Sequence, residues 1–125
     1  MPLKKYKEKR NFARTPEPKG GKKAGKKLVY VVQKHAARRL HWDLRLENKG
    51  VLVSWAVTKE PPKVPGIRRL AVQTEDHPMD YAKFKGTIPK GNYGAGKVEI
   101  WDSGTYKQYK FREDEVMFAV NGRKL

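Results

Sequence analysis

Cysteine is absent from this chain of 125 residues. Its absence excludes disulfide bonds, thiolate nucleophiles and cysteine-based zinc sites. Long apolar runs are also missing: none approaches the roughly 20 residues of a membrane span, and the N-terminus lacks the apolar segment of a secretory signal. No stretch shows a long amphipathic helical pattern. We therefore expect a soluble intracellular protein that is built mainly from strands.

Acidic residues are few. The chain has 13 Asp and Glu against 29 Lys and Arg, which gives a formal net charge of +16. A charge so far from zero indicates a polyanionic partner, with nucleic acid first and an anionic membrane surface second. Although hydrophobic residues make up only 38% of the chain, three Trp, six Tyr and four Phe can fill the core of one domain.

The positive charge is concentrated at the N-terminus. Residues 1–27 carry eleven Lys or Arg and two Glu, a net charge of +9, and residues 19–27 have almost no apolar content. Such a stretch buries too little surface to offset the entropy of ordering it, so we expect a mobile basic arm that tracks phosphates. A solubilising tail or a cloning remnant is the alternative. Within the arm, residues 6–18 are expected to dock on the main domain, residues 28–125, because they include two aromatic side chains.

From residue 28 onward the hydrophobic pattern has a period of two. Residues 28–33 are a β-branched and aromatic run, which is typical of a buried strand. Residues 40–47 and 51–57 form a predicted hairpin around a turn at residues 48–50. Further strands are predicted at residues 69–74, 97–101, 105–109 and, more weakly, 115–120, with one short turn at residues 36–39. Short strands punctuated by Gly and Pro predict an all-β fold, either a barrel or a sandwich.

The strand at residues 40–47 carries the most informative pattern. Its side chains alternate between an apolar face with Leu40, Trp42, Leu44 and Leu46 and a polar face with His41, Asp43, Arg45 and Glu47. His41 and Asp43 can converge on one ion, and His35 can fold back across the turn as a third ligand. Two His and one carboxylate suit Mn²⁺, Zn²⁺ or Fe²⁺, and Arg45 beside them could hold an anionic oxygen. The alternative is a solvated polar face with incidental histidines.

Two further motifs allow more than one interpretation. His77 is predicted to follow a strand end, where working side chains are common, but an Asp-His-Pro turn could equally be a cap. The glycine-rich stretch at residues 91–96 lacks the order of a phosphate-binding loop and no helix pattern follows it, so we interpret it as a flexible hairpin or loop.

Taken together, these motifs resemble the 3′-phosphoesterase domain of bacterial DNA ligase D and its stand-alone archaeal relatives. The matching stretches are RNF (10–12), TPEP (15–18), the residues 32–47 that include HAARRLHWDLRLE, SWAV (54–57), EDHP (75–78) with Tyr81, and IPKGNYGAG (88–96). The resemblance covers nearly the whole chain, and the block at residues 35–47 is highly specific.

The resemblance implies a compact single-domain β-barrel with a crescent groove and two reactions at DNA 3′ ends. A phosphodiesterase step removes a terminal 3′ ribonucleoside, and a phosphomonoesterase step then removes the 3′-phosphate to leave a 3′-OH that a ligase can seal. The family's metal ligands match His35, His41 and Asp43, and Mn²⁺ is its usual activator. Its other active-site residues match Arg45, His77 and Tyr81, and its auxiliary residues match Ser54, Lys59, Arg69 and Glu75. The residues that the resemblance assigns to substrate binding are Arg10, Glu17, Arg45 and Arg69.

The expected partners and location follow from the same resemblance. The expected partners are a DNA primer-template with a 3′-ribonucleotide or 3′-phosphate end and the ligase, polymerase and Ku proteins of end joining. No membrane partner is expected, and the expected location is the cytoplasm of a prokaryote. Two departures matter: Asn11 stands where many members have Asp, and the chain ends where relatives continue through another strand or two. It is thus either a short member or a truncated one that lacks the closing strands. The rival functions are a non-catalytic DNA-binding β-barrel and a hydrolase of small phosphate esters.

Overall fold

The computed structural model describes residues 3–17 and 27–125 of the chain, so most of the basic stretch at residues 19–27 lies outside the described residues. The elements in chain order are α1 (Lys4–Glu8), β1 (Val29–Ala36), β2 (Leu40–Asn48), β3 (Val51–Val57), β4 (Ala71–Pro78), the 3₁₀ helix η1 (Met79–Lys83), β5 (Gly86–Ile88), β6 (Gly96–Phe111) and β7 (Val116–Gly122). Both helices are short, as the sequence predicts. No helix in the described ranges has the length and apolar character that crossing a membrane requires.

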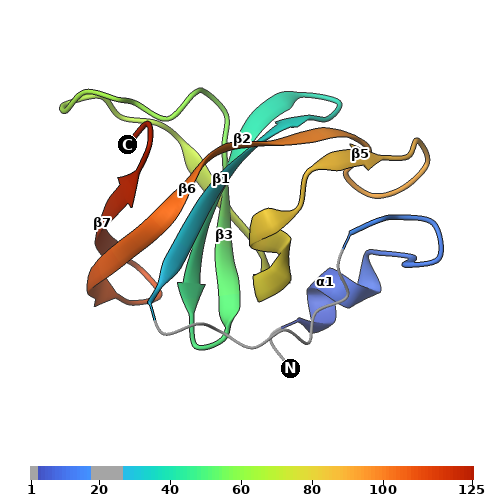
Figure 1. Ribbon diagram of the computed structural model, residues 1–125, viewed down its shortest axis with the longest axis horizontal. Coiled ribbons are helices and arrows are strands. Elements are labelled where there is room, and N and C mark those ends of the chain that lie inside the picture. The colour runs from blue at the N-terminus through green and yellow to red at the C-terminus, as the bar shows by residue number, and fades with distance from the viewer. Residues whose placement is uncertain (1–2, 18–26) are drawn as a thin grey trace.

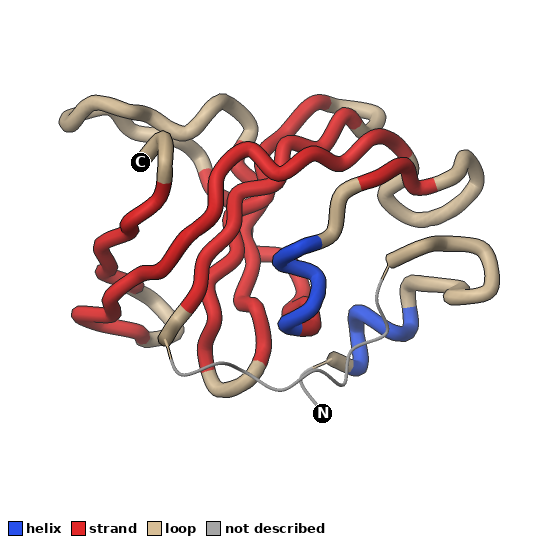
Figure 2. Tube along the Cα trace, viewed as in Figure 1, coloured by secondary structure: helices blue, strands red, loops and turns tan. Residues whose placement is uncertain are grey.

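The seven strands form one antiparallel sheet in the order β4-β3-β2-β1-β6-β5, and β7 pairs with the second half of β6 (Figures 1 and 2). The all-β prediction is confirmed. Among the described strands, however, β4 pairs only with β3, and β7 only with β6, so the sheet does not close on itself. "Barrel" therefore describes this curved, open sheet only loosely.

Three sequence-based expectations about the strands were wrong. The strands predicted at residues 97–101 and 105–109 are one continuous β6, because Gly104 is paired with β1 on one side and β7 on the other. A Cβ at Gly104 would lie 2.1 Å from the Asn121 carbonyl oxygen, so this glycine permits close strand approach rather than a turn. His77 does not follow a strand end, because β4 extends to Pro78 and pairs His77 with Leu52, next to a bulge between Leu52 and Ser54. The short strand β5 was missed.

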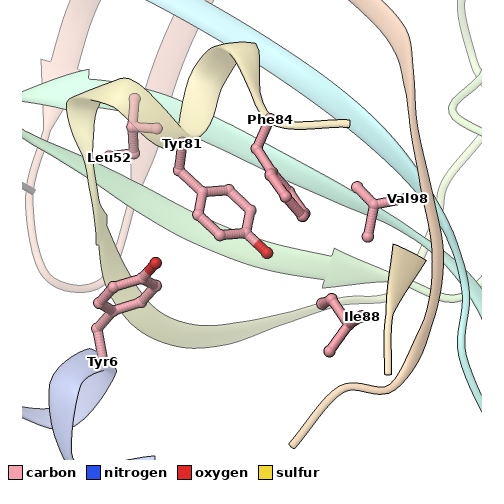
Figure 3. Close-up of a cluster of buried hydrophobic side chains, with 6 residues drawn as sticks. All are labelled: Tyr6, Leu52, Tyr81, Phe84, Ile88 and Val98. Carbon is pink, nitrogen blue, oxygen red and sulfur yellow. The ribbon is translucent and has the colours of Figure 1, made fainter. Parts of the chain in front are cut away.

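The two faces of the sheet carry separate clusters of apolar side chains. One face packs Tyr30, Val32, Leu46 and Tyr106 beneath the β6–β7 hairpin. On the other face, Tyr6 from α1 meets Tyr81 from η1, with their rings 5.9 Å apart and nearly perpendicular (Figure 3). Tyr6 is fully buried. The N-terminal helix and η1 thus cover one face of the sheet, and the polar residues of β2 lie on that covered face.

Candidate active site

Polar side chains from three adjacent strands gather on the face that α1 and η1 cover. The register sets His35 of β1 opposite His41 of β2, and Arg45 of β2 opposite Ser54 of β3. Because side chains alternate along a strand, Asp43 falls between the two β2 residues on the same face. Asp43 and Arg45 are only 6% and 4% exposed. The shared face that the sequence predicts is confirmed, and the alternative of a solvated polar face is wrong for these two residues.

His35, His41 and Asp43 form a cluster that could hold a metal ion, with one ligand atom from each within 4.8 Å of the others. Asp43 Oδ2 lies 3.5 Å from His35 Nδ1 and 3.2 Å from His41 Nε2. Neighbouring ligand atoms around an ion with bonds of about 2.0–2.2 Å are separated by roughly 3–3.5 Å. The carboxylate-to-imidazole separations therefore fit a shared ion.

Backbone carbonyl groups fix the protonation of both imidazole rings. His35 Nε2 donates to the Gly94 carbonyl oxygen at 2.7 Å, and His41 Nδ1 donates to the Arg39 carbonyl oxygen at 3.0 Å. A carbonyl can only accept, so these nitrogens carry protons, which leaves His35 Nδ1 and His41 Nε2, the nitrogens that face Asp43, as the ones available to bind a metal. Metal-bound histidines are held by the same kind of outer hydrogen bond. The residues present therefore fit a divalent transition metal.

The Asp43 carboxylate is ionised in this setting. Burial acts to raise its pKa, but the neighbouring Arg45 guanidinium and hydrogen bonds from His35 and His41 outweigh burial and hold the pKa well below its usual range. In turn, the hydrogen bond to Asp43 raises the pKa of His41. A permanently charged oxygen facing two imidazole nitrogens is a strong attractor for a cation.

Arg45 is oriented by one side chain and one ring. Its Nε donates to Gln33 Oε1 at 2.7 Å, its guanidinium carbon lies 4.8 Å from the centre of the Tyr81 ring, and one Nη is 3.5 Å from Asp43. The other nitrogen, Nη1, is buried and has no hydrogen-bond partner among the described residues. A buried guanidinium N–H without an acceptor is costly, and an anionic oxygen is the acceptor that suits it best.

His77 is buried beside these groups as a neutral ring. Its Nδ1 donates to the Glu75 carbonyl oxygen at 2.9 Å, and its Nε2 accepts from Arg10 Nη2 at 3.3 Å. Burial, with the Arg45 and Arg10 guanidiniums, lowers the pKa of His77 well below its ordinary value. In the free protein at neutral pH the ring is therefore uncharged and keeps a single proton, on Nδ1.

The segment before the basic stretch, which includes Arg10 and Glu17, contacts the site residues. Arg10 Nε donates to Glu17 Oε2 at 2.7 Å, and the Tyr81 hydroxyl donates to the same oxygen at 2.8 Å. Thr15 donates to the other Glu17 oxygen, and Arg10 also contacts Glu75 at 3.4 Å. Glu17 is 4% exposed. These contacts bind the N-terminal segment to η1 and β4, and they occupy the Tyr81 hydroxyl.

A pocket of about 300 Å³ joins these groups. Its lining includes eight of the predicted site residues: Arg10, His35, His41, Asp43, Arg45, Glu75, His77 and Tyr81. Ser54, another predicted residue, is buried next to the pocket, with its hydroxyl 3.5 Å from His77 Nδ1. Two predicted residues lie elsewhere. Lys59 and Arg69 are exposed in the segment between β3 and β4, and Arg69 Nε donates to the Glu60 carbonyl oxygen.

Three residues of the site were missed by the sequence reasoning. Gln33, which has no exposed surface, links Arg45 to the carbonyl oxygens of Tyr81 and Phe84. The sequence signal that could have identified Gln33 is its position two residues before His35, which places both side chains on the same face of the strand. Tyr93 and Gly94 also line the pocket. Their loop was interpreted as a flexible connection, whereas the Gly94 carbonyl oxygen accepts the hydrogen bond from His35.

The sequence of the site-bearing region matches a described family. The sequence model of the DNA ligase D 3′-phosphoesterase domain matches residues 33–125 of this chain. The chain belongs to the DNA ligase D 3′-phosphoesterase family. The resemblance inferred from the motifs is thereby confirmed, and the family's description names phosphoesterase chemistry.

The similar proteins are much longer than this chain. The multifunctional non-homologous end joining protein LigD of Mycobacterium bovis is 49% identical over 129 residues, which cover 98% of this chain and 17% of that protein. The LigD protein of Pseudomonas aeruginosa is 49% identical over 132 residues, 99% of this chain and 16% of that protein. That of Mycolicibacterium smegmatis is 54% identical over 112 residues, 88% of this chain and 15% of that protein. The chain thus spans about one sixth of the length of these relatives.

Proposed function

We propose that this chain is a divalent-metal-dependent phosphoesterase that heals DNA 3′ ends in non-homologous end joining. It removes a terminal 3′ ribonucleoside as a phosphodiesterase and then the remaining 3′-phosphate as a phosphomonoesterase. Mn²⁺ is the metal we expect, and Zn²⁺ is the other candidate. The similar proteins are named as non-homologous end joining proteins, which supports a role at DNA breaks.

One observation carries this proposal: a site fit for a cation adjoins a guanidinium with one buried nitrogen that lacks an acceptor. His35, His41 and Asp43 present three ligand atoms, and Arg45 Nη1 is buried without a hydrogen-bond partner in the described part of the chain. A phosphate oxygen satisfies both groups at once. The pocket is small, at about 300 Å³, which favours a strand end over continuous duplex.

The residues of this chain would bind and orient the phosphate. His35, His41 and Asp43 would hold the metal, which when bound supplies Lewis-acid polarisation of a phosphate oxygen and a lowered pKa for water. Arg45 donates from Nη1 to a non-bridging oxygen, where charge accumulates as the ester is attacked in line. Loss of one such donor typically costs about 10²–10³-fold in rate.

His77 is placed to manage a proton. It starts neutral because burial and two guanidiniums depress its pKa. A phosphate dianion that draws Arg10 and Arg45 toward itself removes part of that positive field, so His77 gains a proton when substrate binds. The protonated Nε2 then donates to a phosphate oxygen or to the leaving oxygen. Ser54 donates its own hydroxyl proton to the Leu52 carbonyl oxygen and has no exposed surface, which favours attack by water over attack by serine.

The decisive experiment uses a 5′-labelled primer-template with a single 3′-terminal ribonucleotide. Incubated with the protein and Mn²⁺, the primer should shorten first to a 3′-phosphate end and then to a 3′-OH end. Chelation of the metal or His41→Ala should abolish both steps. DNA binding that persists without metal, with no shortening under any condition, would instead support the non-catalytic DNA-binding module. Hydrolysis of a small phosphate ester with no action on the primer would support the third candidate.

A further inference from the structure

A second hollow of about 560 Å³ lies beside the metal pocket and shares the side chains of Thr74, Glu75 and Tyr93 with it. Its other lining residues are Lys5, Lys9, Gln73 and Asp76, and the last two, on the edge strand β4, also line the larger hollow beside Trp55 and Phe111. A substrate phosphate held at the metal pocket has a DNA strand on one side and, in the phosphodiester, a terminal nucleoside on the other. The hollow is therefore within reach of one of these two groups.

We propose that this hollow is the subsite for the terminal ribonucleoside that leaves in the phosphodiesterase step, with Tyr93 stacking on its base. This inference rests on the proposed function and extends it to a part of the substrate that the metal pocket does not contact. The charge of the lining indicates that the hollow binds the terminal nucleoside and not the DNA strand. Two lysines face two carboxylates there, so the walls have no net charge, although the chain as a whole carries +16.

The charges of the hollow are also already paired in part. Lys9 Nζ lies 2.9 Å from Glu75 Oε2, which leaves little positive charge for a string of phosphates. A DNA strand gains affinity from unpaired Lys and Arg, whereas an uncharged nucleoside needs an aromatic surface and hydrogen-bond acceptors for its hydroxyls. The hollow offers the second set.

Tyr93 has the exposure and the support of a stacking residue. Its side chain is 50% exposed at the boundary between the two pockets. Lys9 Nζ lies 4.7 Å and Arg10 Cζ 5.5 Å from the ring centre, and these cation–π contacts hold the ring in place. The loop below is tied by hydrogen bonds from Asn92 to the Pro89 carbonyl oxygen and from His35 to the Gly94 carbonyl oxygen. A ring so held loses little freedom when a base stacks on it.

Asp76 supplies an acceptor for the ribose. It is half-buried on the edge strand β4 and lines both this hollow and the larger one, and its side chain makes no hydrogen bond or ion pair with the described residues. An ionised carboxylate accepts hydrogen bonds only, and carboxylates serve elsewhere to bind ribose hydroxyls. Asp76 thus gives the hollow a means of preferring a terminal ribose over a deoxyribose.

The first test is independent of catalysis. A primer-template ending in a 3′ 2-aminopurine ribonucleotide is titrated with protein in EDTA, where stacking on a tyrosine quenches the fluorescence of that base. The wild type and Tyr93→Phe should quench it, and Tyr93→Leu should not. Tyr109→Leu is the matched control, because Tyr109 is also exposed, at 60%, and also has a lysine near its ring. Quenching that persists in Tyr93→Leu would overturn the proposal.

The second test compares the two hydrolytic steps. Single-turnover rates are measured on an end with a terminal ribonucleoside and on an end with only a 3′-phosphate, which has nothing to place in the hollow. Tyr93→Leu should lower the ratio of the first rate to the second about 10-fold, on the scale of one lost base–aromatic stack. Asp76→Ala should lower the preference for a terminal ribonucleoside over a terminal deoxynucleoside. An equal fall on both substrates would mean that Tyr93 contacts the DNA strand or positions His35, and would refute the subsite.

Failure of the proposed function has a different signature. If the wild type hydrolyses neither substrate with Mn²⁺ or Zn²⁺, the phosphoesterase proposal fails, while the fluorescence titration still decides whether a terminal base stacks on Tyr93. If the wild type hydrolyses both substrates and the quenching is unchanged in Tyr93→Leu, the phosphoesterase proposal stands and the subsite is wrong.

Discussion

Replacing Gln33 by Met should destabilise the protein by about 3–5 kcal/mol, because the amide of Gln33 connects buried groups that water cannot reach. Its oxygen accepts from Arg45 Nε, and its nitrogen donates to the carbonyl oxygens of Tyr81 and Phe84. The Tyr81 oxygen keeps a second donor, the Phe84 backbone N–H. Two groups are then left unpaired: one carbonyl oxygen, at about 1–3 kcal/mol, and one charged N–H, at about 2 kcal/mol.

The measurement is urea unfolding followed by tryptophan fluorescence. With a slope of about 2 kcal/mol per M, the loss predicted for Gln33→Met shifts the midpoint by roughly 2 M. Gln108→Met is the matched control: this glutamine is only half-buried and bonds Asn48 and the Tyr106 hydroxyl, so its loss should stay below about 1 kcal/mol. Equal, small shifts for both variants would refute the argument that Gln33 braces Arg45 and η1.

Four further outcomes are expected. His41→Ala should lose both hydrolytic steps, and a structure grown with Mn²⁺ or Zn²⁺ should place one ion within about 2.0–2.3 Å of the three ligands; an ion elsewhere would refute the site. Arg45→Lys should stay badly impaired in single-turnover rate, because an ammonium cannot reproduce a fork of N–H donors, whereas a near-normal rate would mean that only positive charge matters. Because the pKa of His77 is depressed on folding, the unfolded chain binds that proton first. Stability should therefore fall as pH drops below about 6.5, by up to about 1.4 kcal/mol per pH unit more than in His77→Gln, as measured by urea unfolding. Deletion of residues 19–27 should flatten the salt dependence of DNA binding with little change in the saturated rate, whereas Arg10→Ala should lower that rate; the reverse result would exchange their roles.

The period-two pattern was sufficient to predict which side chains of β2 share a face. It holds because strand pairing places every second residue on one side of the sheet, so His41, Asp43 and Arg45 had to lie in one row. The same rule predicts that Gln33 and His35 share a face on β1. Gln33 was missed because the apolar side chains around it indicate only a buried strand. The role of a buried amide becomes visible only when its hydrogen-bond partners are known.

The contacts between the N-terminal segment and the site could not be predicted in the same way. Tyr6 and Arg10 reach the site through contacts with side chains more than 60 positions away, as in the Arg10–Glu75 and Arg10–His77 contacts. Local periodicity contains no information about such pairs. The same limit applies to Lys59 and Arg69, which only the resemblance assigned to the site. Their segment is rich in proline and exposed, and no strand pairing fixes where it lies.

The physical unit that forms the site is therefore wider than the segment that the family pattern covers. The pattern begins at residue 33, yet Arg10 lies 23 residues before it and supplies part of the positive field that keeps His77 neutral. Without Arg10, Glu17 would remain a buried carboxylate held by Thr15 and Tyr81 alone. Burying a charge without its partner is costly. A fragment that starts at β1 lacks Glu17 as well as Arg10, so the Tyr81 hydroxyl would lose its acceptor and the His77 ring would lose the Arg10 contact. The N-terminal segment, rather than the β-sheet alone, sets the protonation state with which the site meets a phosphate.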